Sequence, residues 1–76
     1  MERDKAMRSN LQAARKSKGL TQQAVADKLS VSLRYYQQIE QGTRTGSFEI
    51  WDTLEDITEV HQRILREINP DKEGNR

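Results

Sequence analysis

The sequence predicts an all-α domain, and three observations support that prediction. Apolar residues recur every three or four positions, the spacing of one helix face, from Leu11 through Ile68. Serine and threonine residues that suit helix N-caps precede these runs, and glycines follow two of them. No segment shows the alternation of apolar and polar residues that is typical of a β-strand. With 76 residues, the chain has room for one domain.

The first predicted helix runs over residues 10–17 and follows a flexible polar and basic arm at residues 1–8. Its apolar face consists of Leu11, Ala13 and Ala14. Gly19 ends this helix, because glycine adopts the left-handed conformation of a helix C-terminus at little steric cost.

Two further helices are predicted with a short break between them. Thr21 is a suitable N-cap for a helix over residues 22–29, and Ser32 for a helix that ends near Gln41. Their apolar positions are Val25, Ala26 and Leu29 in the first and Leu33, Tyr36 and Ile39 in the second. The break is too short for antiparallel packing, so the pair is expected to form a helix-turn-helix, which places its second helix in the major groove of DNA.

Ser47 is a suitable N-cap for a fourth helix, and helical structure is expected to stop before Pro70. The apolar positions of this region are Phe48, Ile50, Trp51, Leu54, Ile57, Val60, Ile64, Leu65 and Ile68. Ile50 and Trp51 lie about 100° apart on a helix, so we expect one apolar edge to be exposed. The domain is expected over residues 9–69, with a disordered tail at residues 70–76.

The net charge of +1 hides an uneven distribution along the chain. Residues 1–45 carry nine lysines and arginines against four acidic residues, a charge of +5, and residues 46–76 carry a charge of −4. A basic half is typical of a protein with a polyanion partner, and a random excess on a solvated surface is the alternative.

Several classes of function lack support in the sequence. Without cysteine, neither a disulfide nor a thiolate metal site can form, and a lone histidine, His61, makes no metal site. No glycine-rich phosphate loop or catalytic constellation is present, so we expect no enzymatic activity, no cofactor and no metal. Neither a membrane-spanning run of about 18 apolar residues nor a signal peptide is evident, so we expect a cytoplasmic protein.

The segment around the predicted helix-turn-helix resembles a known family in the joint spacing of its residues. The matching string is Leu11, Arg15, Gly19, Leu20, Thr21, Gln22, Val25, Ala26, Leu29, Val31, Ser32, Ile39, Glu40 and Gly42. Over residues 10–58 the chain resembles the Cro and phage-repressor type of helix-turn-helix domain, also called the XRE type. The resemblance implies a compact five-helix domain, with a break near Glu59 and a fifth helix from about His61 to Ile68.

At four positions in this segment we expect a structural role. The resemblance implies a buried salt bridge between Arg15 and Glu40, and removing either partner would cost about 3–5 kcal/mol. Ser30 stands where the family usually has glycine, and a left-handed serine there would cost about 1–2 kcal/mol. Tyr36 stands where the family usually has isoleucine or valine, so its hydroxyl needs a partner if it is buried.

The exposed face of the third helix is expected to contact base edges in the major groove. The residues of that face are Ser32, Leu33, Arg34, Gln37 and Gln38. Glutamine pairs with adenine and arginine with guanine through two hydrogen bonds each, and leucine contacts the methyl group of thymine. The alternative is an ordinary solvated helix face.

Phosphate contacts are expected around that helix. The candidates are Gln22, Tyr35, Thr43 and Arg44, with Arg8, Lys16 and Lys18 as weaker ones. The resemblance implies this role for Gln22 and for the loop that holds Thr43 and Arg44. Tyr35 either reaches a phosphate through its hydroxyl or packs half-exposed, and the lysines are either phosphate contacts or solvated charges.

Together these features predict a sequence-specific double-stranded DNA-binding transcriptional regulator, a repressor that binds a palindromic operator as a homodimer. The dimer is expected at the fourth and fifth helices and to form mainly on DNA. The candidate interface residues are Trp51, Ile64, Leu65 and Ile68. The resemblance also indicates an origin in a phage or a mobile element.

The alternative function is a protein-interaction module, such as an antitoxin or adaptor. Five acidic residues follow one another without an intervening lysine or arginine: Glu49, Asp52, Glu55, Asp56 and Glu59. Phosphate would repel them, so they are expected to face away from DNA or to bind a protein partner. The basic first half of the chain argues against a loss of DNA binding.

Overall fold

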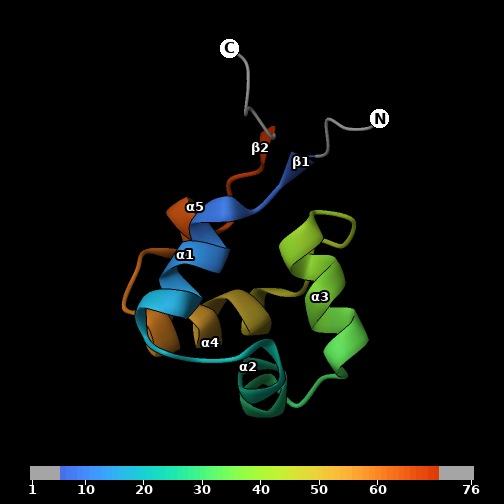
Figure 1. Ribbon diagram of the computed structural model, residues 1–76, viewed down its shortest axis with the longest axis vertical. Helices are drawn as coiled ribbons and strands as arrows, with labels where there is room; N and C mark the ends of the chain where they lie inside the picture. The colour runs from blue at the N-terminus through green and yellow to red at the C-terminus, as the bar shows by residue number, and fades with distance from the viewer. Residues whose placement is uncertain (1–5, 71–76) are drawn as a thin grey trace.

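The structure, a computed structural model, describes residues 6–70 (Figure 1). This part of the chain contains five helices and one short pair of strands. The helices are α1 (Ser9–Ser17), α2 (Gln22–Leu29), α3 (Leu33–Gln41), α4 (Phe48–Thr58) and α5 (Gln62–Leu65). The prediction of an all-α domain with a helix-turn-helix from the second and third helices is confirmed. None of these helices is long and apolar enough to cross a bilayer.

Side-chain caps start three of the helices where the sequence predicts them. The hydroxyl of Thr21 accepts a hydrogen bond from the backbone N–H of Ala24 at 3.0 Å, and Ser32 accepts one from Tyr35 at 3.0 Å. Ser47 accepts from the third residue of α4 at 3.3 Å. Each cap satisfies one of the backbone donors that a helix N-terminus leaves without a partner.

Left-handed residues end or directly follow the first four helices. Gly19 (φ +71°) follows α1, and Gly42 (φ +85°) ends α3. Ser30 ends α2 with a φ of +61°, so the expected left-handed serine is present in the turn. Glu59, with a φ of +63°, ends α4 and confirms the predicted break. The fifth helix is shorter than expected, because it ends at Leu65 instead of near Ile68.

The core lies between α1, α2, α3 and α4, with α5 closing one side (Figure 1). Its fully buried large side chains are Trp51, Tyr36, Leu11, Ile39, Leu54, Leu65, Glu40 and Val25. Ile50 and Trp51 are both buried, and the exposed apolar residue of α4 is Phe48, at 78%. The backbone at Gly46 packs between them, because a Cβ atom there would lie 3.3 Å from the Trp51 ring and 3.6 Å from Ile50.

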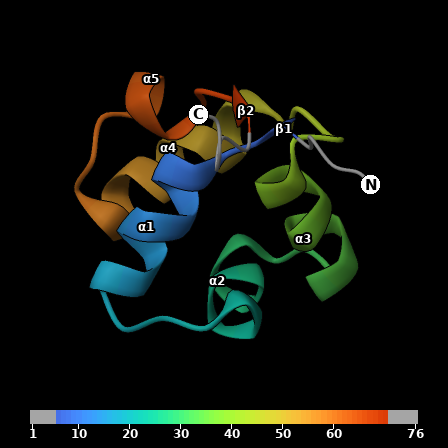
Figure 2. The same cartoon turned by 45° about the horizontal axis from the view of Figure 1, so that its top comes forward.

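A short strand pair that the sequence does not predict closes the domain. Strand β1 (Ala6–Met7) pairs antiparallel with β2 (Asn69–Pro70), which brings the two ends of the described chain together (Figure 2). The prediction of a flexible arm is therefore wrong for residues 6–8, and the predicted tail is wrong at Pro70. Strands of two residues are too short to show alternation. Residues 1–5 and 71–76, the rest of the predicted arm and tail, lie outside the described part of the chain.

Candidate nucleic-acid interface

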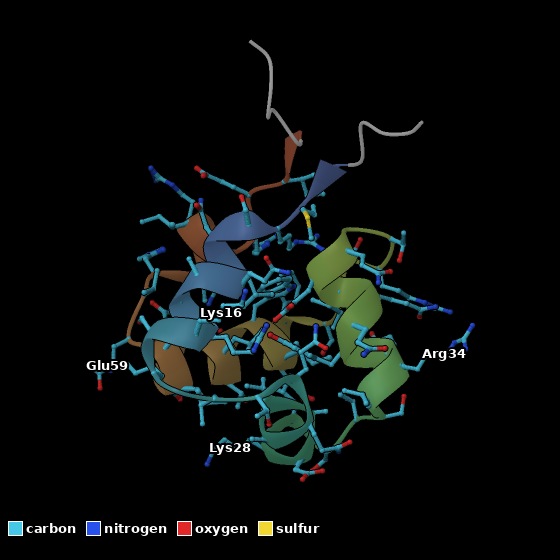
Figure 3. The ribbon with its side chains drawn as sticks, viewed as in Figure 1. Lys16, Lys28, Arg34 and Glu59 are labelled. Atoms are coloured by element: carbon cyan, nitrogen blue, oxygen red, sulfur yellow. The ribbon has the colours of Figure 1, made fainter. Side chains whose placement is uncertain are left out.

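The outer face of α3 carries the side chains expected to contact bases. Arg34 is exposed and projects away from the body of the domain (Figure 3), while Leu33, Gln37 and Gln38 are half-buried. Ser32 is exposed at the start of the helix, but its hydroxyl oxygen already accepts the capping hydrogen bond. A hollow of about 200 Å³ lies on this face and is lined by Arg34, Gln37, Gln38 and Gln41. Sequence reasoning missed Gln41, which continues the same helix face one turn further on.

A buried polar network holds α3 against the helices that precede it. The salt bridge between Arg15 and Glu40 is confirmed, with Nε and Oε2 at 2.6 Å. The Tyr36 hydroxyl donates to the same carboxylate oxygen at 2.5 Å, so the expected partner for this hydroxyl exists. Gln22 donates to the other oxygen at 3.0 Å. Glu40 therefore joins α1, α2 and α3 through one side chain.

The ionisation states in this network support one another. Burial alone would raise the pKa of Glu40, but hydrogen bonds, first that from Arg15, outweigh it and hold the pKa below its usual range. Burial alone would lower the pKa of Arg15, but the hydrogen bond and charge of Glu40 raise it. Burial, followed by the hydrogen bond to the carboxylate, raises the pKa of Tyr36. The network therefore holds an ionised carboxylate, a charged guanidinium and a neutral phenol.

The side chain of Gln22 turns inward and does not support the expected phosphate contact. Its amide nitrogen donates to Glu40, and its amide oxygen accepts a hydrogen bond from Gln37 at 3.2 Å. Gln37, one of the expected base readers, is thereby positioned by α2. A phosphate contact from Gln22 is left to its backbone N–H at the start of α2, where backbone donors and the helix dipole favour an anion.

The loop after α3 is hydrogen-bonded to the base-reading face, the outer face of α3 that carries Arg34, Gln37 and Gln38. Arg44 donates from Nε to the Gln38 side-chain oxygen at 3.1 Å, and its guanidinium lies 5.7 Å from the centre of the Tyr35 ring. Thr43 donates from its backbone N–H to the Gln38 carbonyl at 3.0 Å. The structure thus brings together three residues of the predicted phosphate set beside one residue of the predicted base set.

The two lysines of the predicted phosphate set do not join this cluster. Lys18 forms an ion pair with Glu59 at 3.5 Å, which places it at the acidic end of α4. Lys16 is exposed on α1, left of the middle of the domain in Figure 3, while Arg34 projects from the right edge. The pairing of Lys18 with a carboxylate is evidence against a phosphate contact from that residue.

Arg8 has a structural role that sequence reasoning missed. The residue is 4% exposed and donates from Nη1 to the carbonyls of Ile39 at 2.7 Å and Arg44 at 2.9 Å. Its Nε donates to the carbonyl of Arg66 at 3.1 Å, and its guanidinium lies 5.1 Å from the centre of the Trp51 ring. The expectation of a flexible arm is therefore wrong for Arg8, which three backbone carbonyls hold in the folded domain. A single arginine in a polar segment carries no periodic signal that would have indicated its burial.

Two of the four residues expected at a dimer interface are unable to contact a partner. Trp51 is 1% exposed and Leu65 is fully buried, because both side chains fill the core. The Trp51 indole N–H also donates to the Thr45 carbonyl at 2.7 Å. Ile64 and Ile68 are 46% and 45% exposed and are still available.

The last acidic residue of the run, Glu59, lies away from α3 (Figure 3). Glu59, at the end of α4, and Arg34, on α3, occupy opposite edges of the domain (Figure 3). Asp52 and Glu55 accept hydrogen bonds from Gln62 at 2.8 Å and 3.1 Å. Within residues 6–70 no acidic, histidine or cysteine side chains cluster as a metal site would require, and His61 caps α5 through Nδ1.

Comparison with known proteins supplies one finding. A family model described as helix-turn-helix matches residues 11–61, which is more than half of the chain. The match begins in α1 and ends just before α5, so it includes the helix-turn-helix, the loop after α3 and all of α4. Neither the curated proteins nor the solved structures contain a match.

Proposed function

Because the chain belongs to the helix-turn-helix family of the XRE type, the type of Cro and the phage repressors, we propose that this DNA-binding transcription regulator is a repressor of a palindromic operator. In this proposal a homodimer presents two copies of α3 to successive major grooves on one side of the DNA. A single domain of this size contacts too few base pairs for useful specificity, which favours two copies.

The observation that carries the proposal is a polar helix face held in a fixed position. Arg34 and the glutamines of α3 are available to base edges, while Glu40 anchors the opposite side of the same helix to α1 and α2. Rigid support of this kind matters because a base contact requires donors and acceptors to be placed within hydrogen-bonding distance of one base pair.

The phosphate contacts of the proposal come from the loop after α3 and from the start of α2. Arg44, Thr43 and Tyr35 lie together beside the base-reading face. Such contacts fix the position of the protein on the duplex and carry no sequence information by themselves. Lys16 and Lys18 have no part in this arrangement.

Selection of bound sequences from random double-stranded DNA tests the proposal. The expected result is an enriched palindrome whose half-sites lie about one helical turn apart. A run with Arg34→Ala should relax the preference at one base pair in each half-site, at a cost of about 1–3 kcal/mol. Loss of affinity for every sequence alike would instead make Arg34 a phosphate contact, and the absence of any enriched sequence would refute sequence-specific binding.

Origin and location follow from the same proposal. We place the gene in a phage or an integrated mobile element on the resemblance to phage repressors, and the protein in the cytoplasm, where it would meet its operator. A divergent promoter beside the gene, within such an element, would support repression of neighbouring genes. A neighbouring toxin gene would favour the alternative.

The alternative, an antitoxin or adaptor, draws support from the exposed residues of α4. Four of the five acidic residues that begin at Glu49 are exposed, and the aromatic ring of Phe48 at the start of α4 is largely exposed as well. Exposed apolar surface rimmed by charge is typical of a site that binds a protein. The selection experiment separates the two functions, because a pure adaptor would enrich no DNA sequence.

A further inference from the structure

A pocket of about 620 Å³ lies between the start of α1, the loop before α4 and the α5 region. Three arginines contribute to its lining, Arg8, Arg63 and Arg66, together with His61 and Thr45. The volume is within the range of pockets that hold small molecules, roughly 300–1,000 Å³. None of the residues that read bases in the proposed function lines it.

Arg8 is the most buried of the three arginines that line this pocket. The acceptors that Arg8 contacts, the carbonyls of Ile39, Arg44 and Arg66, are neutral, so these hydrogen bonds do not neutralise its charge. Among residues 6–70, no carboxylate forms an ion pair with Arg8. Burial, and then the positive charge of Arg66, lower the pKa of Arg8, so the surroundings disfavour its charged form.

The rim of the pocket adds further positive charge. Arg63 and Arg66 are three residues apart and both are exposed, so their side chains lie on neighbouring positions of one helical turn. The one carboxylate in the described lining, Glu67, accepts a hydrogen bond from Asn10 at 2.8 Å. The described lining therefore contains three arginines and one carboxylate, which gives it an excess of positive charge.

We propose that the pocket formed by Arg8, Arg63 and Arg66 binds a phosphate-type oxyanion. Guanidinium groups donate paired hydrogen bonds that match the oxygen spacing of phosphate, and a bound anion relieves the repulsion between Arg8 and Arg66. Two sources carry this chemistry: a small phosphorylated molecule, or a backbone phosphate of the operator. Arg8 also donates to the carbonyls of Ile39 and Arg44. An occupied pocket would therefore hold Arg8 in place and, with it, the end of α3 and the loop next to the base-reading face.

The test titrates the isotope-labelled full chain with inorganic phosphate, at constant pH and with chloride balancing the ionic strength. We expect saturable amide shifts confined to the surroundings of Arg8, Thr45 and residues 62–67. Arg66→Gln and Arg63→Gln should each weaken binding about tenfold. Both side chains are exposed, and Arg66→Gln retains the backbone carbonyl that Arg8 contacts, so neither change should disturb folding.

Lys28→Gln is the matched control, since Lys28 is an exposed cation on α2, away from the pocket (Figure 3). It should bind phosphate as the unchanged protein does. Where the unchanged chain binds phosphate, equal weakening in Lys28→Gln, or undiminished binding in the two arginine variants, would overturn the proposal.

A second arm identifies the source of the phosphate and rests on the proposed function. If the free chain does not bind phosphate but Arg66→Gln lowers the salt slope of operator binding by about 0.9, the oxyanion is a DNA phosphate. If neither arm responds to the arginine substitutions, no oxyanion site exists. The first arm contains no DNA, so its outcome is independent of whether the chain is a repressor.

Discussion

Glu40 is the residue on which the placement of α3 depends. Its two carboxylate oxygens accept hydrogen bonds from side chains of α1, α2 and α3, and the residue is 1% exposed. A buried charge that loses its partner is costly, so each of these side chains constrains the others. The network therefore fixes the orientation of the helix that carries Arg34.

Glu40→Gln should destabilise the fold by about 3–5 kcal/mol at neutral pH, because it leaves the Arg15 charge buried without a counterion. Urea unfolding, followed by circular dichroism, measures this difference. Glu49→Gln, at an exposed carboxylate, is the control and should change stability by less than about 0.5 kcal/mol.

The same residue predicts how stability depends on pH. The pKa of Glu40 is lower in the folded state than in the unfolded chain, so its contribution is fully present above the unfolded pKa, about 4.3. Below that value the unfolded state takes up the proton first, and the contribution is lost as pH falls through the folded pKa. Glu40→Gln should therefore lose part of the acid sensitivity. A variant that loses stability in acid as steeply as the original would contradict this assignment.

At the scale of elements, the turn between α2 and α3 contains a strained residue. Ser30 holds a left-handed conformation, and the N–H of Val31 donates to the Ala26 carbonyl at 3.0 Å across the turn. A left-handed non-glycine residue costs about 1–2 kcal/mol. Ser30→Gly removes that cost but increases the freedom of the unfolded chain, so we expect a net gain of up to about 1 kcal/mol.

Thermal unfolding of Ser30→Gly measures this gain. Ser32→Gly is the matched control, because Ser32 has an extended backbone (φ −73°) and caps α3. It should be neutral or slightly destabilising. Equal stabilisation by both changes would show that relief of strain at Ser30 is not the cause.

The loop after α3 should act through phosphates. Arg44 is exposed and is held by Gln38 and the Tyr35 ring, beside the base-reading face. Arg44→Ala should lower the slope of operator affinity against salt concentration, on logarithmic axes, by about 0.9, with little change in sequence preference. Fluorescence anisotropy over a range of salt concentrations measures the slope. An unchanged slope would remove Arg44 from the phosphate contacts.

The elements whose limits could be predicted are those whose ends carry a local signal. Thr21, Ser32 and Ser47 cap helices by hydrogen bonds within three residues, so the sequence alone is enough to place them. The end of α5 has no such signal. The side chain of Gln22 was misassigned for a related reason, because its partners Glu40 and Gln37 are distant in sequence.

At the scale of the whole molecule, the features that sequence reasoning missed depend on contacts between distant segments. Arg8 joins the end of α3, the loop at Arg44 and the residue after α5, and none of these contacts leaves a local pattern. The helical spacing of α4 predicts Trp51 at an interface, because this pattern does not show which loop covers a side chain. In the structure the loop at Gly46 and the Thr45 carbonyl cover its ring.

Two residues of opposite charge lie at opposite edges of the domain. Arg34 projects from one edge and Glu59 from the opposite one, so phosphate attraction and repulsion both favour presenting α3 to DNA (Figure 3). A second copy must then meet the first on a surface that α3 does not occupy. Ile64 and Ile68 are the exposed apolar residues of the α5 region, and they remain the candidates for that contact.

Ile64→Glu and Ile68→Glu should abolish cooperative binding to an operator with two half-sites, because each places a charge in the proposed apolar contact. Both positions are nearly half exposed, so helicity and binding to a single half-site should persist. So small a patch supports only a weak interface, and the free protein should sediment as a monomer at low micromolar concentration. Gel-shift titrations of one-site and two-site operators measure the cooperativity. Phe48→Glu, at the start of α4, is the control; if it alone removes cooperativity, the two copies meet at that end of α4 and not at α5.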